Sequence, residues 1–142
     1  MKNLPLTLAA IAFPILASAE GWLCAADQSV GFKNFSGTWR RTTFTTNDKF
    51  LIRRPTSDEK GTAALYGIAK ADWYVATLGG GAEYACDSHS LTVLDEWHCS
   101  GIVGGAFEFS PKTLRFTELF AGGWVLDGTD TTAVIIGKCT PL

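Results

Sequence analysis

The chain has 142 residues, of which 46% are hydrophobic, and its formal net charge at pH 7 is −2. This length fits a single domain. The basic residues form no patch longer than the doublets Arg40-Arg41 and Arg53-Arg54, which argues against a protein that binds nucleic acid.

The first nineteen residues have the layout of a secretory signal peptide. Lys2 provides a positive start, an apolar run extends from Leu4 to Leu16, and Ala17-Ser18-Ala19 offers small residues for cleavage. The run is shorter than the roughly 20 residues that span a bilayer. We therefore expect a mature domain of residues 20–142, with 11 basic and 14 acidic residues and a charge of about −3, in the periplasm or secreted and without a membrane span.

All four cysteines lie in the mature part of the chain, namely Cys24, Cys86, Cys99 and Cys139. An even number of cysteines in an exported protein predicts disulfides. The absence of a C-x2-C pair argues against zinc. We expect Cys86–Cys99 as a local cross-link and Cys24–Cys139 as a link between the chain ends. The pairing Cys24–Cys86 with Cys99–Cys139 remains an alternative.

Apolar residues alternate with polar ones over much of the chain, a pattern typical of strands with one buried face. Phe107 and Phe109 flank Glu108, and Leu114, Phe116 and Glu118 share one side of the next run. We expect hairpins at 105–119, turning at 110–113, and at 30–44, turning at 36–38. Further strands are expected at 22–26, 49–54, 72–78, 83–86, 91–98, 123–126 and 132–139, the last being central.

About ten short strands in one domain predict an all-β fold, an antiparallel barrel or sandwich. The segment 55–70 differs, because Thr56 and Glu59 fit a capping box while Gly61 and Gly67 oppose a long helix. We expect a short helix or a loop excursion there.

One pattern occurs twice. Trp22-Leu23-Cys24 resembles Trp97-His98-Cys99, and each is followed by a Phe-Ser pair, Phe35-Ser36 and Phe109-Ser110. Residues 72–75 would then correspond to 132–135. The recurrence indicates either a duplication that gives a pseudo-twofold barrel or two unrelated hairpins with aromatic cores. In both cases the repeated residues are core formers, so we interpret the segment as scaffold.

A metal site is the sharpest hypothesis for chemistry. If Cys86 lies opposite Cys99, then Asp87 faces His98 and His89 faces Glu96 on the other side of the sheet. Two histidines and two carboxylates could bind zinc, nickel or copper. That register, however, places a tight turn at Thr92-Val93, where β-branched residues are unfavourable. We expect the turn at residues 87–90 instead, which would separate His89 from His98, and we predict no cofactor and no bound metal.

Catalytic residues are not expected. The sequence has no G-x-S-x-G motif, and neighbouring residues in Ser88-His89-Ser90 would point to opposite faces of a strand. Asp72 precedes Trp73-Tyr74, a combination that suits sugars, but an edge aspartate beside core aromatics explains it as well.

Five tryptophans are many for this length, and some of them could line a cavity or a recognition surface. Our candidates for ligand contact are Trp39, Trp73 and Trp124. The alternative is that small barrels fill their interior with aromatic side chains.

The stretch from Cys99 to Cys139, with FEFSPKTLRF and the ending IIGKCTPL, resembles small secreted bacterial proteins of no assigned activity. The resemblance implies an exported bacterial protein and no catalytic residue. Tyr84-Ala85-Cys86-Asp87 is similar to the Tyr-x-Cys-Asp motif of periplasmic C-type lysozyme inhibitors, which are small disulfide-bearing barrels. In that family the motif lies near the mature start, whereas here it lies mid-chain, so no inhibitory residue is carried over.

These observations predict a monomeric, non-enzymatic binding domain for a small ligand or envelope component. The first alternative is an inhibitor or interaction module that presents a loop, 55–70 or 79–83, to an extracytoplasmic protein. The second is a metal-binding protein that uses His89 and His98.

Overall fold

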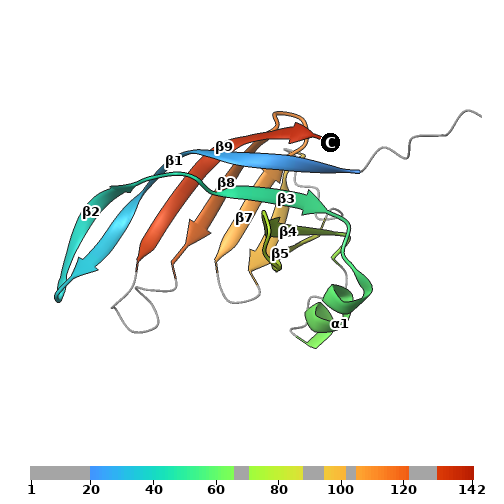
Figure 1. Cartoon of the computed structure of the whole chain (residues 1–142), viewed down its shortest axis with the longest axis horizontal. Coiled ribbons are helices and arrows are strands. Elements are labelled where there is room, and N and C mark those ends of the chain that lie inside the picture. The colour runs from blue at the N-terminus through green and yellow to red at the C-terminus, as the bar shows by residue number, and fades with distance from the viewer. Residues whose placement is uncertain (1–19, 66–70, 88–94, 102–104, 122–130) are drawn as a thin grey trace, which may run out of the picture.

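The computed structural model describes residues 20–65, 71–87, 95–101, 105–121 and 131–142 (Figure 1). The elements within these ranges are β1 (Gly21–Phe35), β2 (Thr38–Phe44), β3 (Lys49–Arg53), α1 (Ser57–Leu65), β4 (Trp73–Thr77), β5 (Ala82–Asp87), β6 (Trp97–Gly101), β7 (Ala106–Ser110), β8 (Arg115–Phe120) and β9 (Thr132–Pro141).

The strands form one antiparallel sheet that closes on itself. Its order is β2-β1-β3-β4-β5-β6-β7-β8-β9, and β1 also pairs with β9. Eight strands therefore make a barrel, with β2 as an extra strand outside the closure. The predicted all-β antiparallel fold is confirmed, and it is a barrel rather than a sandwich.

The longest strand, β1, belongs partly to the barrel and partly to a projection. It pairs with β3 over Gly21–Ala25 and with β2 over Ser29–Phe35, while β9 runs along both parts with an irregularity between Ala26 and Gln28. The expected separate strands at 22–26 and 30–35 are thus one strand. The distal hairpin, residues 28–44, extends beyond the other strands at the end opposite α1 (Figure 1), and we call it the arm.

The barrel interior is filled mainly by aromatic side chains. The buried cluster comprises Cys24, Phe50, Ile52, Trp73, Val75, Tyr84, Cys86, Trp97, Cys99, Phe107, Phe109, Phe116 and Cys139. Phe107 and Phe116 stack with ring centroids 5.0 Å apart. A Cβ atom at Gly137 would overlap the ring of Phe116, so glycine on β9 leaves the space that this ring occupies.

The two Trp-x-Cys segments contribute to one end of this core. Trp22 and Trp97 meet edge to face with ring centroids 5.3 Å apart, and Trp73 and Phe109 pack against both. We call these four residues the tryptophan end. Cys24, Trp97, Cys99 and Phe109 of the repeated pattern are buried and serve packing, as the scaffold interpretation expects. Phe35, the counterpart of Phe109, is instead 45% exposed near the tip of the arm.

Both predicted disulfides are present. Cys24 is bonded to Cys139, and Cys86 to Cys99, each pair directly opposite on neighbouring strands. The barrel divides into two halves, β1-β3-β4-β5 and β6-β7-β8-β9. Each half begins with a Trp-x-Cys segment, and its last strand carries a second cysteine, Cys86 in β5 and Cys139 in β9. The disulfides therefore close the two seams between the halves.

Two expectations about strands are corrected. Residues 73–75 lie in β4, the third strand of the first half, and residues 132–135 lie in β9, the fourth strand of the second half, so they do not correspond. Of the strand expected at 91–98, residues 91–94 lie outside the described residues; in the remainder, β6 begins only at Trp97 and runs to Gly101, after Asp95 in the left-handed region (φ 54°). The strand expected to be central, β9, does pair on both sides, with β1 and with β8, while its residues Val134 and Ile136 point outward and are exposed. The strand expected at 123–126 lies outside the described residues.

The segment after β3 forms a short helix, and its capping box is confirmed. The Thr56 amide donates to Glu59 Oε2 (2.8 Å), and the Glu59 amide donates to Thr56 Oγ1 (3.3 Å). Arg53 donates to both oxygens of the same carboxylate, which lowers the pKa of Glu59 to about 2. No helix within the described ranges is long and apolar enough to cross a membrane.

Candidate functional site

The register across β5 and β6 is the one that the metal hypothesis required. Cys86 lies opposite Cys99 and Asp87 opposite His98. Because Asp87 pairs with His98, it does not close a tight hairpin at 87–90. The Cys86–Cys99 bond holds this register, and the rest of the expected turn, residues 88–90, lies outside the described residues.

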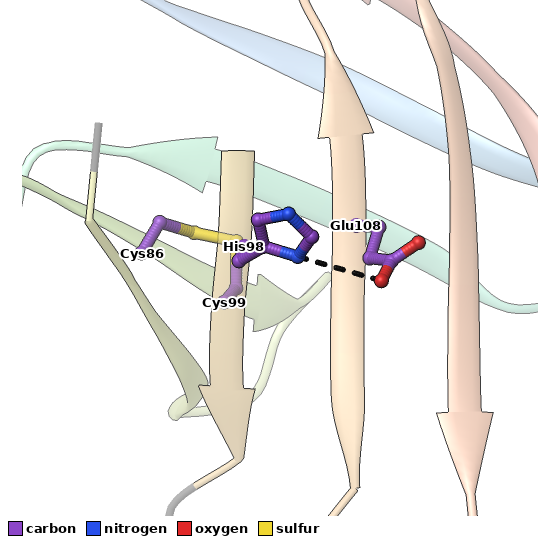
Figure 2. The surroundings of a disulfide bond; sticks show 4 residues. All are labelled: Cys86, His98, Cys99 and Glu108. Carbon is purple, nitrogen blue, oxygen red and sulfur yellow. Dashed lines mark ion pairs between the residues drawn. A yellow bond between two sulfur atoms is a disulfide. The ribbon is translucent and has the colours of Figure 1, made fainter. Parts of the chain in front are cut away.

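The metal site itself does not follow from this register. His98 lies beside Glu108 of β7, with Nδ1 3.4 Å from Oε1, and both side chains are nearly half exposed (Figure 2). His89 lies outside the described residues. Among the residues that are described, no three His, Cys, Asp or Glu side chains converge on a common metal position. The His98–Glu108 contact is a surface pair, a type that contributes little stability.

The two candidate tryptophans that the structure describes, Trp39 and Trp73, lie in different parts of the fold. Trp73 is 5% exposed in the tryptophan end, and the guanidinium of Arg54 covers its ring at 3.9 Å from the centroid. Trp39 lies on β2 in the arm, opposite Asn34. Trp124 falls outside the described residues. A shared tryptophan-lined cavity therefore has no support from the two residues that can be placed.

Asp72 also belongs to the structure around Trp73. Its amide donates to the carbonyl of Cys86 (3.2 Å), and its carbonyl accepts from Arg54 (3.4 Å). Because Arg54 occupies the face of Trp73, the aromatic platform that a sugar would use is already covered by a cation.

A buried polar pair lies toward the arm end of the barrel. The hydroxyl of Tyr84 donates to the carboxyl of Glu118, and both residues are less than 10% exposed. Burial raises the pKa of Glu118, and the nearby carboxylates of Glu83 and Asp48 raise it further. Glu118 is two residues after the buried Phe116, so both side chains point to the same, inner face of β8. This spacing is the sequence signal that identifies Glu118 as a buried acid.

Replacing Glu118 by glutamine should raise stability relative to the wild type as pH increases. Because its folded pKa is raised, Glu118 contributes stability that is fully present below the usual value of 4.5 and is lost as pH rises through the folded pKa. Glutamine cannot ionise and still accepts the hydrogen bond from Tyr84. Urea unfolding between pH 4 and 8 measures the effect, with Glu108→Gln on the surface as control. Parallel pH profiles for wild type and Glu118→Gln would contradict the account.

The outer face of the barrel carries an apolar surface. Val30 of β1 lies opposite Val134 of β9, which in turn lies opposite Leu119 of β8. Phe32 and Ile136 continue the same face. The five residues are exposed by 40%, 38%, 39%, 52% and 44% respectively, and we call them the outer patch.

A groove adjoins the outer patch where β1, β2 and β9 meet. Its volume is about 370 Å³, and its lining includes Val30, Phe32, Val134 and Arg41. Gly31 allows the close approach of β1 and β9 here, because a Cβ atom at this position would overlap the carbonyl oxygen of Thr132. The groove is open to solvent, so side chains of a partner can enter it.

The arm is basic, whereas the whole chain has a formal net charge of −2. Residues 28–44 contain Lys33, Arg40 and Arg41 and no acidic residue. Lys33 and Arg40 lie opposite each other, and their cationic groups are 5.8 and 6.0 Å from the ring centroid of Phe35. The opposite face of the arm presents Arg41 beside Phe32.

Comparison with protein-family models, with curated proteins and with solved structures finds no match. The site is therefore defined by its geometry alone. Sequence reasoning identified the hairpin at 30–44 but not its projection from the barrel, because the pattern of a hairpin is the same whether its far edge is paired or open.

Proposed function

We propose that this chain is an exported, non-enzymatic binding domain that contacts another protein through the arm and the outer patch. The observation that carries the proposal is the row Leu119–Val134–Val30 with Phe32 and Ile136, exposed on three neighbouring strands. Exposed apolar surfaces that are contiguous and bordered by polar residues mark interaction sites in soluble proteins.

The barrel interior supports this function over the small-ligand alternative. Its described part is occupied by aromatic side chains in mutual contact, and Trp73 is covered by Arg54. An interaction module needs no internal cavity. Its surface would be the arm rather than either of the loops expected from the sequence, 55–70 or 79–83.

Two disulfides suit a protein that resides in an oxidising compartment outside the cytoplasm. Together with the signal-peptide layout of residues 1–19 and the resemblance to small secreted bacterial proteins, they support an exported protein, either periplasmic or secreted. A monomer fits a surface that is open for a different partner.

The test compares retention of proteins from the extracytoplasmic fraction of the source organism on three immobilised forms of the mature chain. These are the wild type, Val30→Ser/Val134→Ser, and Leu78→Ser as matched control, since Leu78 is 56% exposed away from the outer patch. We expect a protein that is retained by the wild type and by the control, but at least ten-fold less by the outer-patch variant.

Two results would contradict the proposal. One is equal retention by all three forms. The other is a small molecule that remains bound to the wild type in native mass spectrometry, disappears on denaturation, and is unaffected by the outer-patch substitutions. The second result would favour the small-ligand function instead.

A further inference from the structure

The edge of β2 is the part of the arm that can form new backbone hydrogen bonds. In the sheet, β2 is a terminal strand and pairs only with β1 among the described residues. Its seven residues include no proline and no glycine. Natural edge strands are commonly blocked by proline, bulges, short length or charged side chains. β2 has none of the first three, and its charged residues are Arg40 and Arg41, which repel another basic strand and attract an acidic one.

The turn of the arm determines which backbone groups face outward. Ser36 and Gly37 have φ values of 51° and 86°, as in a type I′ turn, and Phe35 pairs with Thr38. In such a hairpin the residues that flank the turn form a hydrogen-bonded pair, and bonded and non-bonded pairs then alternate. Lys33–Arg40 and Gly31–Thr42 are therefore bonded pairs, while Arg41 and Thr43 direct their N–H and C=O groups to the open edge.

The side chains at this edge select for negative charge. Arg40 and Arg41 are adjacent, so they project from opposite faces of the strand. A segment that pairs with β2 places its own residues next to these side chains on both faces. Two consecutive acidic residues would each meet one arginine, and no acidic residue of the arm competes with them.

A second copy of the chain fits the edge poorly. In a symmetric antiparallel pairing about the middle of β2, Arg41 would lie opposite the Arg41 of the other copy, and like charges in that position are destabilising. A membrane is also a poor fit. At the tip of the arm, the exposed ring of Phe35 is flanked by the polar residues Asn34, Ser36 and Thr38, and unpaired backbone groups are costly in hydrocarbon.

We propose that the open edge of β2 binds an extended acidic segment of a partner protein by strand addition. The backbone groups of Arg41 and Thr43 form the ladder, and Arg40 and Arg41 contact two adjacent Asp or Glu residues of the segment. This inference rests on the proposed function, because both assign binding to the arm, and it adds the mode of binding and the chemistry of the partner.

The test is selection from a library of random decapeptides displayed on phage, with the mature, disulfide-bonded chain as bait. We expect enrichment of peptides with two adjacent acidic residues among β-branched ones. Arg40→Glu/Arg41→Glu should lose these peptides at least ten-fold and enrich basic ones. Lys60→Glu/Lys112→Glu makes the same charge change outside the arm, at exposed positions, and should select as the wild type does.

A second variant tests the backbone. Thr43→Pro removes one outward N–H and leaves the bonded pairs with β1 in place, so it should weaken the selected peptides at least ten-fold while its circular dichroism stays that of the wild type. The inference is overturned if no acidic peptide is enriched, if the charge-reversed bait selects the same peptides, or if the wild type instead binds phosphatidylglycerol vesicles through the arm.

The two proposals fail in different ways. If the wild type enriches no acidic peptides but still retains a partner through the outer patch, strand addition is rejected and the proposed function stands. Failure of that retention as well would reject the proposed function.

Discussion

Replacing Cys24 and Cys139 together by alanine should lower the free energy of unfolding by about 5 kcal/mol, the largest loss that we expect for either cross-link. The bond joins residues separated by 115 positions, so its removal frees almost the whole domain in the unfolded state. It also releases the seam at which β1 and β9 close the barrel. Alanine fits these buried positions without introducing a polar group.

The matched control is the other disulfide. Cys86 and Cys99 are separated by 13 positions, and the same chain-entropy relation gives a loss of about 3 kcal/mol for Cys86→Ala/Cys99→Ala. Urea unfolding of both double variants measures the difference of about 2 kcal/mol. The prediction also holds if the variant without Cys24–Cys139 does not fold while the variant without Cys86–Cys99 does. Equal losses, or a larger loss for the short loop, would contradict it.

Phe107→Ala should lower the free energy of unfolding by about 3–5 kcal/mol, because it removes a ring from the middle of the core. Phe107 is fully buried. It stacks on Phe116 at 5.0 Å between centroids and contacts Phe50 at 5.4 Å and Tyr84 at 5.7 Å. The hole cannot be filled by one neighbour without disturbing the others.

Phe32→Ala is the control for this substitution. Phe32 is 52% exposed in the outer patch, and its removal should change the free energy of unfolding by less than about 0.5 kcal/mol. Thermal and urea unfolding of both variants give the comparison. If Phe32→Ala is as destabilising as Phe107→Ala, Phe32 is part of the core, and its assignment to the exposed outer patch is wrong.

Local patterns predicted most of the fold because they report on one strand or one turn at a time. The alternation around Glu108 predicted the inward positions of Phe107 and Phe109. The pair Thr56 and Glu59 predicted the start of α1. The signal-peptide pattern of residues 1–19 and an even number of cysteines predicted two disulfides, and both are present.

Properties that depend on distant pairing could not be predicted in this way. Residues 22–26 and 30–35 appear as two strands in the sequence, and they form one because β9 pairs along the whole length. The β-branched run at 134–136 indicated a central strand, but the exposure of Val134 and Ile136 depends on what covers the outer face. The open edge of β2 is a property of the assembled sheet, since only the strand order shows that nothing described pairs with it.

The central claim is that this barrel binds a partner protein through its outer surface and the arm. Hydrogen–deuterium exchange of the mature chain, with and without the protein that it retains, tests this claim most directly. We predict slower exchange in β2 on binding and no change in the core strands β4 and β7. Slower exchange confined to those core strands, with β2 unchanged, would place the binding site inside the barrel and contradict the account.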